Sequence, residues 1–294
     1  MKKIVTMCPG KVHNGVWRHL KELECTGLTQ HIDLEENAGI SDDVEWIIFG
    51  GCWTDKYDRL AREYKKEGKK IALLHCSPLG QTDICRELTH LNNAISLIDE
   101  GRIDRLFVGE EKTALGLKAI NKEIKFLPQC LDAEKFDLKL SAISQEMGNK
   151  ISSPKSENRE FDNCRTLKDM QAGLFCSSAP NKNLLNQVVA LRIADVFVHT
   201  NAFDREMCRF ANRIGLRYWK YGYMPESEYY RRILACDFGM QVSFSEAFDY
   251  VVAEFLLAGK PVIVSETIDW LRHYPLCAKC DNIQDIVEKI FTVT

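Results

Sequence analysis

The sequence lacks the long apolar segments of membrane-spanning proteins and the short motifs of several large enzyme classes. No run approaches the roughly 18 apolar residues that a spanning helix needs. The apolar stretch near the N-terminus is too short for a secretory signal, and Pro9 and Gly10 follow it. HExxH, GxSxG and internal repeats are also absent. We therefore expect a cytoplasmic protein without a transmembrane segment, and neither a zinc peptidase nor a serine hydrolase.

The chain also carries no net positive charge. The net charge is −3 and the isoelectric point is about 6.2, so no overall basic field attracts nucleic acid or anionic lipid. The 12 cysteines are numerous but scattered, which favours free thiols. Only Cys277 and Cys280 have a metal-binding spacing, and a lone CxxC is a weak zinc signal. We expect no metal and no resident cofactor.

Two segments resemble nucleotide-binding motifs but do not match them. The loop from Pro9 to Gly15 follows the first predicted strand, but Val16 stands where a P-loop has its lysine, and GxGxxG does not occur there. Asp237-Phe238-Gly239 resembles a kinase tripeptide without the kinase's other loops. We interpret Gly10 and Gly15 as residues that let the backbone turn tightly and approach a ligand.

Short apolar strands alternate with amphipathic helices along the chain. This pattern predicts parallel sheets with helices on both faces, and ligands gather outside the carboxyl ends of such strands. Periodicity fades over residues 138–168, which we interpret as a hinge between domains 1–150 and 151–294. The predicted strands are 4–8, 45–49, 70–75, 105–109, 124–127, 172–176, 195–198 and 261–264.

The most informative segment runs from Ser245 to Pro261 and places Glu254 inside an apolar stretch. Asp249 is a good N-cap, so we expect a helix that starts near Tyr250 and ends at Gly259. Most sides of this helix are apolar, and an unpaired buried charge is costly, so a polar partner must meet Glu254. That partner is either a bound ligand or a core lysine or arginine.

A helix N-terminus suits a phosphate or diphosphate, because its N–H groups are unpaired and carry partial positive charge. A nucleotide sugar fits the arrangement. Its diphosphate would lie near Ala247, Phe248 and Asp249, its ribose hydroxyls near Glu254, and its sugar near Glu246.

The segment from Asp237 through Glu246 and Glu254 to Ile263 resembles the signature of family 4 retaining glycosyltransferases, whose core is a Glu-x7-Glu pair. The resemblance implies a GT-B fold, in which two Rossmann-like domains with parallel sheets face each other across a cleft. It also implies that Glu246 contacts the donor sugar and Glu254 the ribose. Asp249 departs from the family pattern, which often has glycine there, and its carboxylate would repel a diphosphate.

The same resemblance assigns further roles. His75, which follows a predicted strand, would face the donor sugar. Lys182 would neutralise the leaving diphosphate, although Ser177 stands where the family has an arginine. The backbone near Tyr223 and Met224 would contact the nucleobase.

We therefore predict a metal-independent glycosyltransferase that transfers a sugar from a nucleotide-sugar donor to an unidentified acceptor with retention of configuration. The acceptor is a glycan, a lipid, a protein or a modified nucleic acid. Two alternatives remain: a nucleotide-sugar epimerase of GT-B architecture, and a non-catalytic nucleotide-sugar-binding protein.

Overall fold

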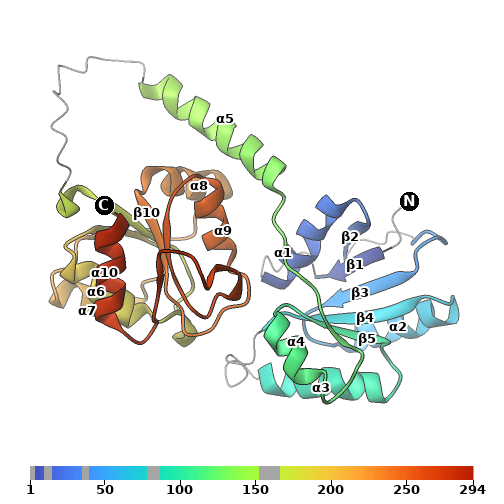
Figure 1. Ribbon diagram of the computed structural model, residues 1–294. Helices are drawn as coiled ribbons and strands as arrows, with labels where there is room; N and C mark the ends of the chain where they lie inside the picture. Colours follow the sequence, from blue (N-terminus) through green and yellow to red (C-terminus); the bar gives the residue numbers. More distant parts are fainter. Residues whose placement is uncertain (1–3, 10–14, 35–39, 78–86, 152–165, 294) are drawn as a thin grey trace. The chain divides into compact units, whose positions relative to one another are not determined.

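The structure is a computed structural model that describes residues 4–9, 15–34, 40–77, 87–151 and 166–293. The chain divides into two compact units, Met1–Asp132 and Ala133–Thr294. Each unit contains one six-stranded sheet whose strand pairs are parallel, with helices packed against it (Figure 1). The predicted α/β architecture is confirmed in both halves of the chain.

In the first unit the sheet has the strand order β2-β1-β3-β4-β5-β6. Its strands are β1 (Ile4–Cys8), β2 (Thr29–Asp33), β3 (Trp46–Gly50), β4 (Lys70–His75), β5 (Arg105–Val108) and β6 (Ile124–Phe126). Its helices are α1 (Gly15–Glu22), the 3-10 turn η1 (Leu23–Thr26), α2 (Asp55–Lys66), α3 (Glu87–Asp99) and α4 (Glu111–Leu117). Residues of α2, α3 and α4 share a core cluster with one face of the sheet, and residues of α1 pack with the other face.

In the second unit the strand order is β12-β11-β10-β7-β8-β9. Its strands are β7 (Gln171–Leu174), β8 (Phe197–Thr200), β9 (Tyr218–Lys220), β10 (Phe238–Gln241), β11 (Val262–Ser265) and β12 (Cys277–Ala278). Its helices are α5 (Ala133–Ile151), α6 (Leu184–Ile193), α7 (Arg205–Arg213), α8 (Glu226–Ala235), α9 (Tyr250–Leu257) and α10 (Ile283–Val293), with 3-10 turns η3 (Leu167–Asp169), η4 (Pro180–Lys182) and η5 (Asp269–Leu271).

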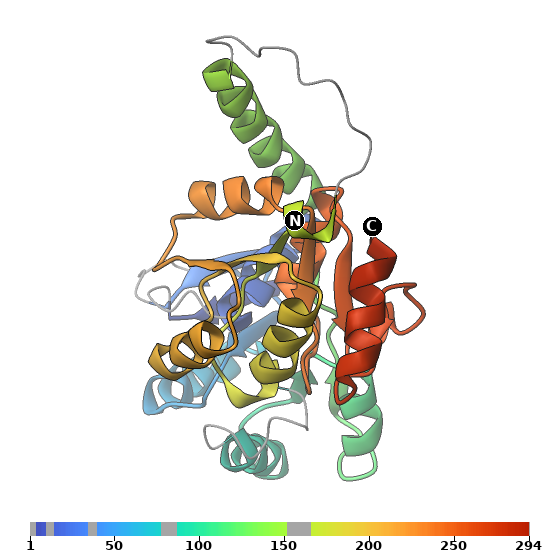
Figure 2. The same ribbon diagram turned by 90° about the vertical axis from the view of Figure 1, so that its left-hand side faces the viewer.

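Two layers of helices enclose the second sheet. One core cluster joins the sheet to α6, α7 and α10, and a separate cluster joins its other face to α5, α8 and α9. Helices α6 and α10 pack together on their face (Figure 2). Because both faces are covered, β10 and β11 are buried at every residue. The apolar run at 261–264 predicted β11 as a buried strand, whereas β10, which ends in Gln241, was not predicted.

The division between the units falls earlier than the predicted boundary at residue 150. Helix α5 occupies the start of the predicted hinge, and its apolar residues Phe136, Leu140 and Ile143 belong to the core cluster of α8 and α9. The polar composition of residues 138–168 concealed this apolar face. Residues 152–165 of the predicted hinge, and Gly10, lie outside the described residues.

Glycines in β7 and β10 allow α9 to approach the sheet closely. A Cβ atom built at Gly239 would lie 2.7 Å from Phe255 Cγ, and one built at Gly173 would lie 2.5 Å from Phe255 Cζ. The ring of Phe255, next to Glu254 on α9, therefore lies directly on two glycine backbones. Larger residues at these positions would push α9 away from the sheet.

We expect Gly239→Ala to destabilise the protein by about 1–3 kcal/mol, because the new methyl group overlaps the Phe255 ring inside a packed core. Chemical denaturation monitored by circular dichroism measures the change. Gly116→Ala is the matched control, since its Cβ would meet no atom within 4 Å in helix α4. Equal stability of the two variants would contradict the packing argument.

Within the described ranges, no helix combines the length and the apolar character that crossing a membrane requires.

Candidate functional site

Two loops meet where the neighbouring strands β7 and β10 end. One runs from Phe175 into α6, and the other runs from Val242 to the start of α9. Asn181 binds the second loop twice: its side chain donates to the Ser245 carbonyl at 3.1 Å, and its own carbonyl accepts from Phe244 N at 2.7 Å. Gln187 also joins the loops, because it donates to the Lys182 carbonyl and accepts from Val242 N.

These bonds hold Lys182 beside two carboxylates. The Lys182 ammonium forms an ion pair with Glu246, and its Nζ lies 3.8 Å from Asp249 Oδ2. The side chains are only 17%, 10% and 3% exposed, respectively. The structure thus brings together three residues that the sequence analysis selected. When all three are ionised, the cluster carries one more negative than positive charge.

The excess negative charge shifts the protonation of the cluster. Burial, followed by repulsion from Asp249, raises the pKa of Glu246 to about 7, against the attraction of Lys182. Burial alone would lower the pKa of Lys182, but Asp249 and Glu246 raise it above its ordinary value. Lys182 therefore stays charged at neutral pH, and Glu246 titrates near neutrality.

Because the folded protein favours protonated Glu246, this group stabilises the fold at pH below about 4.5 and loses that contribution as the pH rises through about 7. We expect a loss on the order of 1–3 kcal/mol over this range, measured as the difference in unfolding free energy between wild type and Glu246→Gln. Parallel pH curves for the two proteins would contradict the shifted pKa.

Asp249 caps α9, as the sequence predicts. Its Oδ1 accepts a hydrogen bond from Val252 N at 3.2 Å, and the helix begins at Tyr250. The backbone at Asp249 has a positive φ of 60°, which a residue with a side chain rarely adopts. The carboxylate therefore covers helix N–H groups that a diphosphate would use, and glycine would fit this backbone better.

Glu254 is 1% exposed and meets two hydroxyl groups of α8. Tyr229 donates to Oε2 at 2.7 Å. The Tyr230 hydroxyl lies 3.4 Å from Oε1 and 3.2 Å from Glu226 Oε1, so its one proton is shared between two carboxylates. The required polar partners are thus present as tyrosines.

The sequence analysis did not assign a role to Tyr229 or Tyr230. The available signal was the requirement for a polar group near Glu254, but spacing alone could not show that α8 supplies it. The two bonds need strands β7 and β10 to place α8 and α9 on the same face of the sheet.

The other predicted contacts in this unit are distributed around the loops. Tyr223 is 94% exposed, while Met224 is partly buried against the α8–α9 core. Ala247 is half-buried, and Phe248 stacks on Trp270 with ring centroids 5.2 Å apart. Trp270 Nε1 also donates to the Phe248 carbonyl at 2.7 Å. The proposed donor contacts of these four residues stay predictions.

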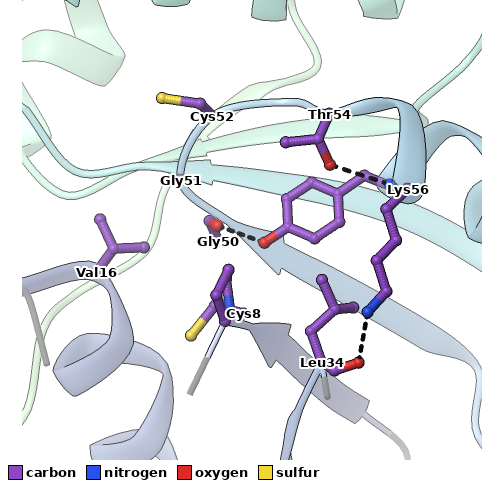
Figure 3. A pocket seen from close by; sticks show the side chains of 10 residues that line it. Cys8, Val16, Leu34, Gly50, Gly51, Cys52, Thr54 and Lys56 are labelled. Atoms are coloured by element: carbon purple, nitrogen blue, oxygen red, sulfur yellow. Dashed lines mark hydrogen bonds between the residues drawn. The ribbon is translucent and has the colours of Figure 1, made fainter. Parts of the chain in front are cut away.

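His75 and Gly15 belong to the first unit. His75 is the last residue of β4 and is buried, and Gly15 begins α1. A pocket of about 410 Å³ lies in the same unit, at the carboxyl ends of β1 and β3 (Figure 3). Its lining comes from β1, α1, the ends of β2 and β3, and the start of α2: Cys8, Pro9, Val16, Leu34, Gly50, Gly51, Cys52, Thr54, Lys56 and Tyr57.

Among the residues that the structure describes, no group of three or more histidine, cysteine, aspartate or glutamate side chains has the arrangement of a metal site. In the CxxC pair, the Cys280 thiol contacts Glu266 Oε1 at 3.6 Å, and burial raises its pKa to about 11. Cys277 and Cys280 are both free thiols.

No protein-family profile and no curated protein matches the sequence. Solved structures do match the fold. Anabaena HepE in complex with UDP shares 14% identity and a TM-score of 0.67, covering 99% of this chain and 89% of that one. The complex of HepE with UDP and glucose gives the same TM-score at 13% identity, with the same coverage. Trehalose-6-phosphate synthase OtsA has a TM-score of 0.61 at 12% identity, and the match covers 86% of this chain and 65% of OtsA.

These similarities identify the fold as GT-B, with two Rossmann-like domains. The predicted fold class is confirmed. The narrower resemblance to family 4 stays a prediction.

Proposed function

We propose that the protein is a glycosyltransferase that uses a nucleotide-sugar donor and retains the configuration of the transferred sugar. The observation that carries the proposal is the buried cluster of Lys182, Glu246 and Asp249 at the start of α9. Two solved structures of HepE, which has the same fold, contain bound UDP. The Glu-x7-Glu pair and its surroundings support a donor that lies across this helix start.

In this proposal each charged group has a defined task. Lys182 stabilises the negative charge that develops on the leaving diphosphate, together with N–H groups around Ala247 and Phe248. Glu246 accepts hydrogen bonds from the donor sugar, and Glu254 accepts them from the ribose. As the family resemblance implies, no metal takes part in this proposal, and the positive charge comes from Lys182 and from the N–H groups that Asp249 leaves open.

The first unit completes the reaction in this proposal. His75 helps to place the donor sugar, and the first unit binds the acceptor, with Gly15 next to the bound molecules. Exclusion of water from the reacting sugar would limit hydrolysis of the donor.

Incubation of the purified protein with a panel of nucleotide sugars tests the reaction class. Slow release of free sugar and nucleoside diphosphate supports a transferase, because water replaces the missing acceptor. An isomerised sugar nucleotide would instead support an epimerase. Binding without turnover would support a non-catalytic protein, for which the charge of Asp249 and Ser177 in place of the family's arginine are specific arguments. Absence of binding to every member of the panel would overturn the proposal.

The charge of Asp249 gives a separate prediction about affinity. We expect Asp249→Gly to bind UDP-glucose about tenfold more tightly, because it removes a carboxylate next to the diphosphate and suits a φ of 60°. Isothermal titration calorimetry measures the affinity. Asp204→Gly is the matched control, since Asp204 caps α7 by the same type of bond, to Met207 N at 2.8 Å. Weaker binding by Asp249→Gly would show that the carboxylate assists the donor.

A further inference from the structure

The pocket of the first unit lies at the point where the order of the sheet reverses. The chain passes from β1 to β2 on one side and then to β3 on the other side of β1. Cys8 ends β1, Gly50 ends β3, and both line the pocket. In doubly wound sheets this reversal leaves a crevice outside the strand ends, and ligands bind there.

Several polar groups around the pocket have hydrogen-bond partners within the first unit. The Tyr57 hydroxyl donates to the Gly50 carbonyl at 2.9 Å, and the Lys56 ammonium donates to the Leu34 carbonyl at 2.9 Å (Figure 3). Thr54 Oγ accepts from Tyr57 N at 3.3 Å. The N–H of Gly51 donates to the Leu74 carbonyl at 3.2 Å. Each of these groups therefore already has one partner, although the Lys56 ammonium and the exposed Thr54 hydroxyl keep protons that they can donate to a ligand.

Among the described residues, most of the remaining lining is apolar. Val16 and Leu34 contribute branched side chains, Tyr57 its ring, and Gly50 and Gly51 bare backbone. A sugar carries a hydroxyl on almost every carbon and loses hydrogen bonds to water when it is buried without new partners. An apolar ring or chain makes no such hydrogen bonds with water, and its transfer from water into an apolar pocket is favourable. The lining therefore favours an apolar group over a sugar.

We infer that this pocket binds the apolar part of the acceptor, and that the acceptor is an alcohol or phenol with an apolar body rather than a free sugar. The inference rests on the proposed function, because it names the acceptor class of that reaction. A volume of about 410 Å³ accommodates a fused aromatic ring or a short branched chain and falls within the usual range of small-molecule sites.

Cys52 provides a direct reporter of occupancy. It lines the pocket and is exposed, whereas Cys25 is also exposed but is not part of the lining. Iodoacetamide alkylates both thiols, and peptide mass spectrometry follows each rate in the same sample. We expect 2-naphthol to slow alkylation of Cys52 saturably, by about threefold or more, while the rate at Cys25 is unchanged. Glucose at the same concentrations should slow neither.

A variant that reduces the volume of the pocket provides a second test. Val16→Phe places a larger side chain on the pocket wall, so it should weaken the protection of Cys52 by 2-naphthol. Its thermal unfolding midpoint is measured alongside. If Val16→Phe is folded and the protection is undiminished, the ligand binds elsewhere and the inference is wrong.

Selective protection of Cys52 by glucose, without protection by 2-naphthol, would overturn the inference in favour of a sugar acceptor. Equal slowing of Cys25 and Cys52 would show a non-specific effect and would also overturn it. Neither measurement uses a nucleotide sugar, so both can fail while the donor panel succeeds. Failure of the panel with selective protection by 2-naphthol would leave an apolar binding site and remove the proposed function.

Discussion

Lys182→Met is expected to lower the rate of donor turnover by about 10²–10³-fold, because the leaving diphosphate loses its ammonium partner. The same substitution leaves Glu246 and Asp249 buried without their cation. Breaking a buried ion pair in this way costs about 3–5 kcal/mol of stability. Loss of activity by itself would therefore not separate catalysis from folding.

Two further variants separate the effects. In Lys182→Met combined with Glu246→Gln, one of the two uncompensated charges is gone, so we expect most of the stability to return while turnover stays well below that of Glu246→Gln alone. Lys182→Arg keeps the positive charge, so we expect it to be more stable than Lys182→Met and to retain part of the wild-type turnover. Release of nucleoside diphosphate and chemical denaturation are measured on each protein. If the double variant regained activity with its stability, Lys182 would have a structural role only.

Glu254→Gln is expected to weaken binding of the donor by about 10–100-fold, since hydrogen bonds to a charged acceptor are worth about 1.5–3 kcal/mol. Glutamine keeps the shape of the side chain and one acceptor oxygen for the hydroxyls of Tyr229 and Tyr230. It removes a buried charge, so we expect the fold to be retained.

Calorimetric titration with UDP-glucose measures this change, and the unfolding transition checks the fold. Glu288→Gln on the exposed side of α10 is the matched control for loss of one negative charge. Unchanged affinity in folded Glu254→Gln would mean that the carboxylate serves only to bind the two tyrosines of α8.

Features encoded locally were predictable from the sequence. Strand β4 has the predicted bounds, and Asp249 caps a helix that begins at Tyr250. Continuous apolar runs identified β3, β4 and β11 because both faces of each sheet are covered, but the central strand β10 was not predicted. The isolated carboxylate at Glu254 indicated a polar environment, since burial of an unpaired charge is costly.

Features that depend on tertiary contacts were not predictable. Strand β2 was missed because its buried residues include Thr29 and His31, whose polarity hides the strand. Thr6 on β1 bonds the His31 ring at 2.9 Å, which satisfies both groups, but only the paired strands bring them together. Tertiary contacts also provide the tyrosine partners of Glu254. They likewise form the hydrogen bonds of Lys56 and Tyr57 beside the pocket of the first unit.

Asp249 adds a negative charge at a position where a glycine would add none. A glycine there would leave the α9 N–H groups open and Lys182 paired with Glu246 alone. The carboxylate instead adds a second negative charge to a buried cluster and raises the pKa of Glu246. We therefore expect donor binding to favour the protonated cluster, with higher affinity for UDP-glucose at pH 6 than at pH 8.

A crystal structure of the protein with UDP tests the central claim most directly. The account predicts the diphosphate at the start of α9 beside Lys182, the ribose hydroxyls on the carboxylate of Glu254, and the Tyr229 hydroxyl moved from its present position 2.7 Å from that carboxylate. UDP bound elsewhere, with Glu254 still bonded to both tyrosines, would contradict it.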